Sequence, residues 1–316
     1  MDYARITREV LVRHPQNPIL TPQDFPVRMR AVYNCSAIKT PAGKYVMLCR
    51  VNQLNHLTLL WGADSPDGVR WKVRPEPFEM PKDELWRAVS RSVYYDPRIT
   101  LIDGRYLVLI ACHGDQDCRV ALFRSRDLKT LKFANFVNVP DNRNMVIFPE
   151  KSRDGRYMRL ERPNTPSGGG KGNIWLSHSP DLVHWGDSHE VLRTGPHLWN
   201  YAYSGLGAST VPYRTREGWL VIFHAIMNNC STREYSVGAM LLDLDKPWLV
   251  RHVTRHPILF PEAEYELRGL VEHVCFPCSK IVEPDGTVKV YYGAADTVQC
   301  LATGKLDDII YACKHW

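Results

Sequence analysis

Hydrophobic residues along this chain occur in short runs of strand length, separated by turns that contain glycine or proline. Examples are "YVMLC" at 45–49, "YLVLIAC" at 106–112 and "WLVIFHA" at 219–225. Short apolar runs rich in β-branched and aromatic residues, bounded by such turns, are typical of β-strands. Candidate helices are confined to two short segments, near 82–90 and 305–312. The pattern therefore predicts an all-β protein.

The hydrophobic runs belong to a unit that recurs five times. Each copy has a polar or proline-marked start, a few apolar residues, a glycine turn and a second strand. This order predicts a β-hairpin in which glycine supplies the positive φ of the turn. The five copies span 34–50, 96–112, 148–163, 209–225 and 277–296. Their turn glycines are Gly43, Gly104, Gly155, Gly218 and Gly286.

A further strand follows each hairpin and ends in an aspartate turn with an aromatic residue after it. The clearest pairs are Asp67 with Trp71, Asp127 with Phe133, and Asp181 with Trp185. Four short strands per unit, repeated five times, predict a five-bladed β-propeller. We expect it to form a single domain over residues 1–316, with a short N-terminal arm at about 1–15. The alternative fold is a pair of β-sandwiches.

The innermost strand of each propeller blade lines a central channel, so the ends of the five hairpins should meet at one mouth of that channel. Each residue at these ends, taken alone, also fits a turn or a surface salt bridge. A convergent ring of polar groups on a rigid scaffold predicts a small-molecule site. The residues at these ends are Asn34, Arg50, Asp96, Arg162, Ser209, His224 and Asp296.

Asp96 is the acid of this ring whose local conformation the sequence constrains most. Pro97 follows it, and proline disfavours the helical region for the residue before it. We therefore expect Asp96 in an extended conformation at the start of a strand, with its carboxylate directed into the channel.

Composition narrows the classes of partner. The chain has 40 basic and 34 acidic residues and no block of five Lys or Arg, so we expect no nucleic-acid partner. No stretch approaches 18 apolar residues and the first residues lack an apolar signal core, so we expect no membrane span and no secretory signal. Nine cysteines scattered in hydrophobic runs predict reduced thiols in a cytoplasmic protein. The CxxC of Cys275 and Cys278 lacks a second pair, so no metal is expected.

Longer motifs resemble glycoside hydrolase family 130. They are "NPILTPQDFP", "DPRIT", "NRNMVIFPEK", "RLERP", "IWLSHSPDLVHWG", "GWLVIFHA", "GAMLLDLDKPW" and "VKVYYGAADT", in order from about residue 16 to 310. The resemblance implies a five-bladed propeller that phosphorolyses a β-D-mannoside with inversion to α-D-mannose 1-phosphate. It implies a carbohydrate and inorganic phosphate as partners, phosphate being a co-substrate, and no cofactor. Homo-oligomerisation is left open.

The resemblance also assigns roles to residues. An inverting hydrolase needs an acid and a base, whereas a phosphorylase replaces the base with bound phosphate in a cationic cradle. Asp96 matches the family's general acid, which is thought to protonate the leaving oxygen through a hydroxyl of the bound mannose. The residues that match the phosphate cradle are Arg143, Asn144, Arg162, His224 and Tyr235. The residues that match the mannosyl site are Asn34, Arg50 and Asp296.

Two positions depart from the family pattern. Tyr95 stands where the family usually has glutamate before the acid, and Ser204 or Gly205 stands where phosphorylases usually carry a lysine. Our interpretation is a phosphorylase that requires a high phosphate concentration, or one that takes the missing charge from a neighbouring loop.

Two alternative functions follow from the same residues. An inverting β-mannosidase would need a carboxylate that activates water, for which the candidates are Glu150, Glu161 and Glu234. A non-catalytic sugar-binding propeller is the second alternative. The acceptor sugar and the linkage are left open, and Trp86 and Trp199 could either stack on the acceptor or pack a loop.

Overall fold

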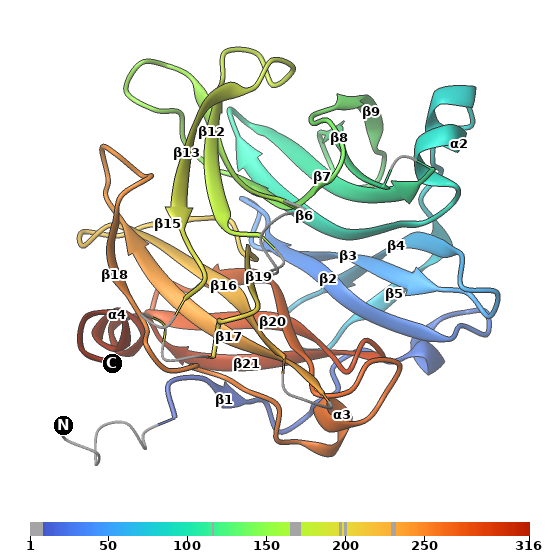
Figure 1. Ribbon diagram of the computed structural model, residues 1–316. Coiled ribbons are helices and arrows are strands. Elements are labelled where there is room, and N and C mark those ends of the chain that lie inside the picture. Colours follow the sequence, from blue (N-terminus) through green and yellow to red (C-terminus); the bar gives the residue numbers. More distant parts are fainter. Residues whose placement is uncertain (1–8, 116, 165–171, 196–197, 199–200, 229–231) are drawn as a thin grey trace.

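The protein is a five-bladed β-propeller, which confirms the predicted architecture and rules out the paired sandwiches. The computed structural model describes residues 9–115, 117–164, 172–195, 198, 201–228 and 232–316. Five antiparallel sheets surround a central channel (Figure 1), and the first strands of neighbouring sheets contact one another around most of the ring.

The first three blades each contain four strands in chain order, from the channel outward. Blade 1 consists of β2 (Ala31–Lys39), β3 (Tyr45–Asn52), β4 (Thr58–Ser65) and β5 (Lys72–Pro77). Blade 2 consists of β6 (Tyr94–Ile102), β7 (Arg105–Gly114), β8 (Asp117–Ser125) and β9 (Lys132–Phe136). Blade 3 consists of β10 (Asn142–Ile147), β11 (Tyr157–Pro163), β12 (Ile174–Ser179) and β13 (Gly186–Leu192).

The last two blades depart slightly from this plan. Blade 4 consists of β14 (Gly205–Ala208), β15 (Tyr213–Arg214), β16 (Trp219–Asn228), β17 (Arg233–Leu242) and β18 (Val250–Val253). Its extra strand β15 pairs with β16. Blade 5 consists of β19 (Cys275–Val282), β20 (Thr287–Ala294), β21 (Val298–Lys305) and the N-terminal strand β1 (Val12–Arg13).

The turns of the repeat take the predicted forms. All five turn glycines have positive φ, from 68° at Gly104 to 144° at Gly218. In the aspartate turns, the carboxylate accepts hydrogen bonds from backbone N–H groups two and three residues later, as Asp67 does from Val69 and Arg70 at 2.9 Å each. Since the side chain caps the turn, this short motif can recur in successive blades without long-range support.

Strand β1 closes the ring by pairing with β21, next to which it lies in Figure 1. Its Arg13 donates two hydrogen bonds of 2.8 Å to the carboxylate of Glu266, a fully buried side chain. Charge-assisted bonds of this kind are stronger than neutral ones. The described part of the predicted N-terminal arm is therefore the outer strand of the last blade.

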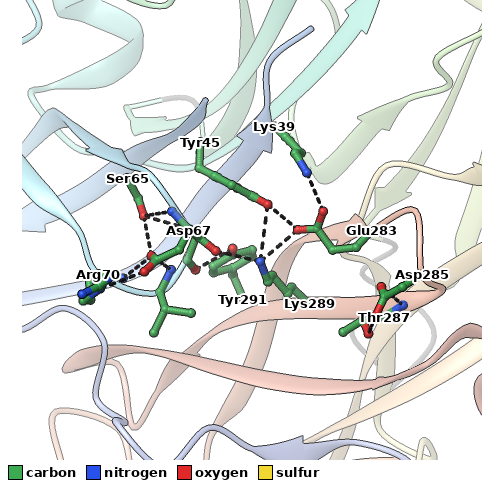
Figure 2. Close-up of polar contacts among 12 residues, drawn as sticks. Lys39, Tyr45, Ser65, Asp67, Arg70, Glu283, Asp285, Thr287, Lys289 and Tyr291 are labelled. Atoms are coloured by element: carbon green, nitrogen blue, oxygen red, sulfur yellow. Dashed lines mark hydrogen bonds and ion pairs between the residues drawn. The ribbon is translucent and has the colours of Figure 1, made fainter. Parts of the chain in front are cut away.

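A polar network also joins the first blade to the last (Figure 2). Glu283, which follows β19, accepts hydrogen bonds from Lys39 and Tyr45 of blade 1 at 2.6 Å and from Lys289 of its own blade at 2.9 Å. Lys289 continues the network to the backbone oxygen of Asp67 at 2.7 Å. These donors outweigh the cost of burial and lower the pKa of Glu283 to about 2.

Helices are few and lie outside the ring of sheets. They are the 3-10 turn η1 (Pro22–Asp24) and the helices α2 (Glu84–Ser90), α3 (Glu264–Leu267) and α4 (Leu306–His315). Helices α2 and α4 match the two predicted segments, whereas the single turn of α3 was not predicted. Among the described helices, none is long and apolar enough to cross a membrane. The eight described cysteines are free and buried, and Cys230 lies outside the described residues.

Candidate active site

The inner strands of blades 1, 2 and 3 are each interrupted by a β-bulge at the same point. At each bulge the residue directed to the channel has a left-handed backbone: Asn34 with φ 52°, Asp96 with φ 52° and Asn144 with φ 54°. The expected extended conformation of Asp96 is therefore wrong. Asn and Asp tolerate this conformation better than other side-chain-bearing residues, and bulges redirect side chains beside active sites. The local bulge outweighs the preference that Pro97 imposes.

The redirected side chains face a cavity of about 250 Å³ at the channel end where these strands begin. Of the predicted residues, His224 and Ser209 do not line it, and the others do: Asn34, Arg50, Asp96, Arg143, Asn144, Arg162, Tyr235 and Asp296. His224 is fully buried directly behind Arg162. The structure thus brings together, from all five blades, the residues that the sequence selected.

One wall of the cavity is built around Asp96. Its Oδ1 atom accepts hydrogen bonds from Asn34 Nδ2 and from Arg50 Nη1, both at 3.0 Å. The Arg50 guanidinium lies 4.1 Å from the ring centroid of Tyr33 and 5.0 Å from that of Tyr95, so two aromatic faces hold it in place. These contacts fix the orientation of the carboxylate through a single oxygen.

Asp296 is the second carboxylate that lines the cavity. Burial raises its pKa to about 6, and the neighbouring charge of Asp96 adds to this rise while Arg50 opposes it. Asp296 therefore changes its charge close to neutral pH. The neighbouring carboxylate, Asp96, is held by Arg50.

The opposite wall carries two arginines in directly opposed positions, Arg143 on β10 and Arg162 on β11. Like charges placed opposite each other in a sheet are unfavourable. Arg143 is paired with Asp141 at 3.1 Å, whereas Arg162 contacts no carboxylate among the described residues. Burial, followed by repulsion from Arg143, lowers the pKa of Arg162 to about 10. An anion between the two guanidinium groups would relieve both effects.

His224 supports Arg162 from behind. Its Nε2 lies 3.3 Å from Arg162 Nη1 and its Nδ1 lies 2.9 Å from Ser209 Oγ. Since the guanidinium can only donate, the arrangement favours the tautomer with the proton on Nδ1. Gly207 makes room for the ring, because a Cβ there would lie 2.2 Å from a ring carbon of His224.

Several buried polar atoms around the cavity have no hydrogen-bond partner among the described residues. They are Asn34 Oδ1, Arg50 Nε, Arg143 Nε, Asn144 Oδ1 and Arg162 Nε. Buried polar groups in native proteins are nearly always satisfied, so a cluster of orphans indicates a polar occupant. Amide oxygens can accept from sugar hydroxyls, and guanidinium nitrogens can donate to an oxyanion.

The carboxylates proposed for a hydrolase lie elsewhere. Glu150 is exposed and pairs with Arg214 at 3.2 Å, and Glu161 is buried against Arg159 at 2.7 Å. Glu234 accepts a hydrogen bond from Ser236 at 2.8 Å. None of these three glutamates lines the cavity.

The aromatic candidates for an acceptor site gain no support. Trp86 is 3% exposed and packs against Tyr94 and Phe123 in the core of blade 2, so it is a core residue. The stacking interpretation of Trp86 is therefore wrong. Trp199 lies outside the described residues.

Some residues of the site were not selected from the sequence. Arg98 is 2% exposed and donates hydrogen bonds to the backbone oxygens of Asp96 and Pro97 at 3.1 Å each. These bonds stabilise the bulged backbone. Arg233 and Phe276 line the cavity. A signal was present for the bulges: Tyr33-Asn34, Tyr95-Asp96 and Arg143-Asn144 occupy equivalent places in three blades. Arg233 is placed by blade packing, for which the sequence has no local signal.

One group of described residues could present three metal-ligand atoms within 4.8 Å: His178, Asp187 and His189. These side chains belong to the outer strands of blade 3 and do not line the cavity. Arg156 already pairs with the Asp187 carboxylate at 3.0 Å, and His178 bonds to the backbone oxygen of Asp187 at 3.2 Å. Protein partners thus account for the cluster.

Comparisons with known proteins match nearly the whole chain. The sequence model of glycoside hydrolase family 130, described as β-1,4-mannooligosaccharide phosphorylase, matches residues 6–315. The chain is 31% identical to the β-1,4-mannooligosaccharide phosphorylase of Ruminococcus albus, over 98% of this chain and 92% of the relative. It is 34% identical to a β-1,2-mannobiose phosphorylase of Listeria innocua, over 82% of this chain and 69% of the relative.

A solved structure shows the same fold. The β-1,2-mannobiose phosphorylase from Listeria innocua in complex with β-1,2-mannobiose superposes with a TM-score of 0.87 at 26% identity. The match covers 96% of this chain and 99% of that chain.

Proposed function

The chain belongs to glycoside hydrolase family 130, and on that premise we propose that it catalyses inverting phosphorolysis of a β-D-mannoside. The products are α-D-mannose 1-phosphate and the released sugar. The observation that carries the proposal is the pair of opposed arginines, Arg143 and Arg162, whose buried Nε atoms are unsatisfied and of which only Arg143 has a carboxylate partner among the described residues. A phosphate group fits this arrangement because its oxygens accept bidentate hydrogen bonds from guanidinium.

We infer the following division of roles. Phosphate is held by Arg143, Asn144 and Arg162, with His224 behind them and Tyr235 beside them. The mannosyl ring lies between the cradle and the wall formed by Asn34, Arg50 and Asp296. Fixing phosphate against the sugar converts a bimolecular attack into a local one, which removes much of the entropic cost.

The chemical step balances with one acid. A phosphate oxygen forms a bond to the anomeric carbon while the glycosidic C–O bond breaks, and the proton of Asp96 passes to the leaving oxygen through a mannose hydroxyl. Hydrogen phosphate carries a proton of its own, which restores Asp96 after the transfer. The net reaction therefore consumes hydrogen phosphate and the mannoside and yields mannose 1-phosphate and an alcohol. No second catalytic carboxylate is required.

The hydrolase alternative rests on one observation, the absence of a lysine at Ser204 and Gly205. Against it, none of the three candidate bases lines the cavity. The deciding experiment incubates the protein with β-1,4-mannobiose, β-1,2-mannobiose and β-mannosyl glucose, with and without phosphate. Formation of mannose 1-phosphate that saturates with phosphate supports the proposal. Free mannose released at a rate indifferent to phosphate would establish a hydrolase, and no product from any β-mannoside would favour a binding protein.

A further inference from the structure

Ser204 stands where phosphorylases of the family usually carry a lysine. Its side chain is neutral, and the residue is held by hydrogen bonds to β16. It is 8% exposed, its N–H donates to Ile226 at 2.9 Å, and its Oγ accepts from the N–H of Asn228 at 2.9 Å. Gly205 pairs with Ile226 as the first residue of β14. Neither residue brings charge to the cavity, so any compensating charge comes from elsewhere.

The hydrogen bonds of Ser204 lead directly to an arginine. Asn228 is the last residue of β16 and lies opposite Arg233, the first residue of β17. The side-chain oxygen of Asn228 accepts a hydrogen bond from Arg233 Nε at 3.0 Å. Ser204, Asn228 and Arg233 therefore form a continuous chain from the lysine position to a guanidinium group.

Arg233 is directed toward the phosphate cradle. It lines the same cavity as Arg143, Arg162 and Tyr235. Residues two apart on a strand share a face, which places Arg233 next to Tyr235 on the cavity side of β17. Its guanidinium makes no ion pair within the described part of the chain, and the side chain is exposed, so its terminal nitrogens are available to a ligand.

Two of the four arginines that line the cavity have no carboxylate partner among the described residues. Arg50 is neutralised by Asp96 at 3.0 Å and Arg143 by Asp141 at 3.1 Å. Arg162 and Arg233 have no carboxylate partner among the described residues. Asp296 also lines the cavity but forms no ion pair with either of them within the described residues, so both guanidinium groups can donate to a phosphate dianion.

We propose that Arg233 supplies the cation that the chain lacks at Ser204 and Gly205, and that it binds the phosphate co-substrate from the rim of the cavity. The inference rests on the proposed phosphorylase function. A guanidinium offers planar, bidentate recognition of phosphate that a lysine does not, and it substitutes for the lysine from an adjacent strand. The competing role for Arg233 is a contact to the acceptor sugar.

The test measures initial rates of wild type and of Arg233→Gln while phosphate and mannoside are varied separately. Loss of one charge-assisted contact should raise the KM for phosphate roughly 10- to 100-fold, with a smaller change in the KM for the mannoside. In the synthetic direction, the KM for mannose 1-phosphate should rise and that for the acceptor should not. Arg193→Gln is the matched control, because Arg193 is exposed and pairs with Glu190 at 2.8 Å, away from the cavity.

A second variant tests whether both positions serve one anion. Ser204→Lys combined with Arg233→Gln should restore phosphate binding toward the wild-type level, and Arg233→Lys should keep part of it. An unchanged phosphate KM in folded Arg233→Gln, or a rise confined to the acceptor KM, would overturn the inference. Phosphate-independent release of mannose by the wild type would instead overturn the proposed function itself, so the two failures are distinguishable.

Discussion

Arg50 and Asn34 bind the same oxygen of Asp96, Oδ1, at 3.0 Å each. The described donors therefore anchor one oxygen of the carboxylate and leave Oδ2 for a proton. A general acid needs this combination, because its orientation must be fixed while one oxygen exchanges a proton with the substrate.

Asp96→Asn tests the acid directly. The amide keeps the size of the side chain and the tolerance for a left-handed backbone, so we expect a folded protein with a similar melting temperature. Turnover should fall by about 100-fold or more, the usual scale of general acid catalysis. Phosphorolysis rates and thermal unfolding, measured on the same preparation, check this. Near-normal turnover would assign the acid to another residue.

Arg162→Ala tests the cradle. Arg162 has no carboxylate partner among the described residues, so its removal strands no buried anion, and under the proposed function it removes a direct phosphate contact. We expect kcat/KM for phosphate to fall by about 100-fold or more, with little change in mannoside binding measured without phosphate. Arg156→Ala is the control, because Arg156 pairs with Asp154 and Asp187 outside the cavity. Equal losses in the two variants would indicate a general effect on the blade.

The sequence predicted the repeats because their signals are local. A glycine turn and an aspartate cap are each specified within a few residues, so Gly43 and Asp67 could be interpreted without knowing the fold. Part of the site followed from the topology, since equivalent hairpin ends must meet at the channel, whereas Arg143, Asn144 and Tyr235 were assigned only by the family resemblance. The bulge at Asp96 was missed because two local preferences conflict there, and the tertiary setting decides between them.

Contacts between segments far apart in the chain could not be predicted from short stretches of sequence. The pairing of β1 with β21, the burial of Trp86 and the position of Arg233 depend on which blades become neighbours. Nothing within a few residues of Arg233 distinguishes it from an exposed arginine on a strand end.

Glu283→Gln tests the closure between the first and last blades. The neutral amide cannot balance Lys39 and Lys289, so we expect the free energy of unfolding to fall by about 1–3 kcal/mol at pH 7. The folded pKa of about 2 lies below the ordinary value of 4.5, so the carboxylate stabilises the fold fully above pH 4.5 and less as the pH falls toward 2. Denaturant unfolding between pH 3 and pH 7 should therefore show a flatter pH dependence in the variant.

Glu217→Gln provides the control for this change, because Glu217 is half exposed and pairs only with Lys314 among the described residues, at 3.1 Å. We expect it to alter the free energy of unfolding by less than about 1 kcal/mol. If Glu283→Gln were equally mild, the network in Figure 2 would contribute little to ring closure.

Asp296→Asn tests whether the cavity holds a carboxylate that titrates near neutral pH. Its folded pKa of about 6 lies above the ordinary value of 3.8, so the unfolded state releases the proton more readily. The ionised side chain thus destabilises the fold above pH 6, and this penalty vanishes as the pH falls below 3.8. We expect Asp296→Asn to melt at a higher temperature than wild type at pH 7.5 and to show no such gain at pH 4. Asparagine also tolerates the left-handed backbone at this position, where φ is 51°.

Asp296→Asn should lower kcat/KM for the mannoside although it raises the melting temperature. An ionised Asp296 accepts hydrogen bonds from sugar hydroxyls more strongly than the protonated form, so kcat/KM for the mannoside in wild type should fall as the pH drops below about 6. In Asp296→Asn this acid limb should disappear and kcat/KM should be lower throughout. Rate profiles and melting curves from pH 4 to pH 8 measure both effects. A gain in melting temperature that is equal at pH 4 and pH 7.5 would show that ionisation is not its cause, and an unchanged acid limb would place that titration on another group.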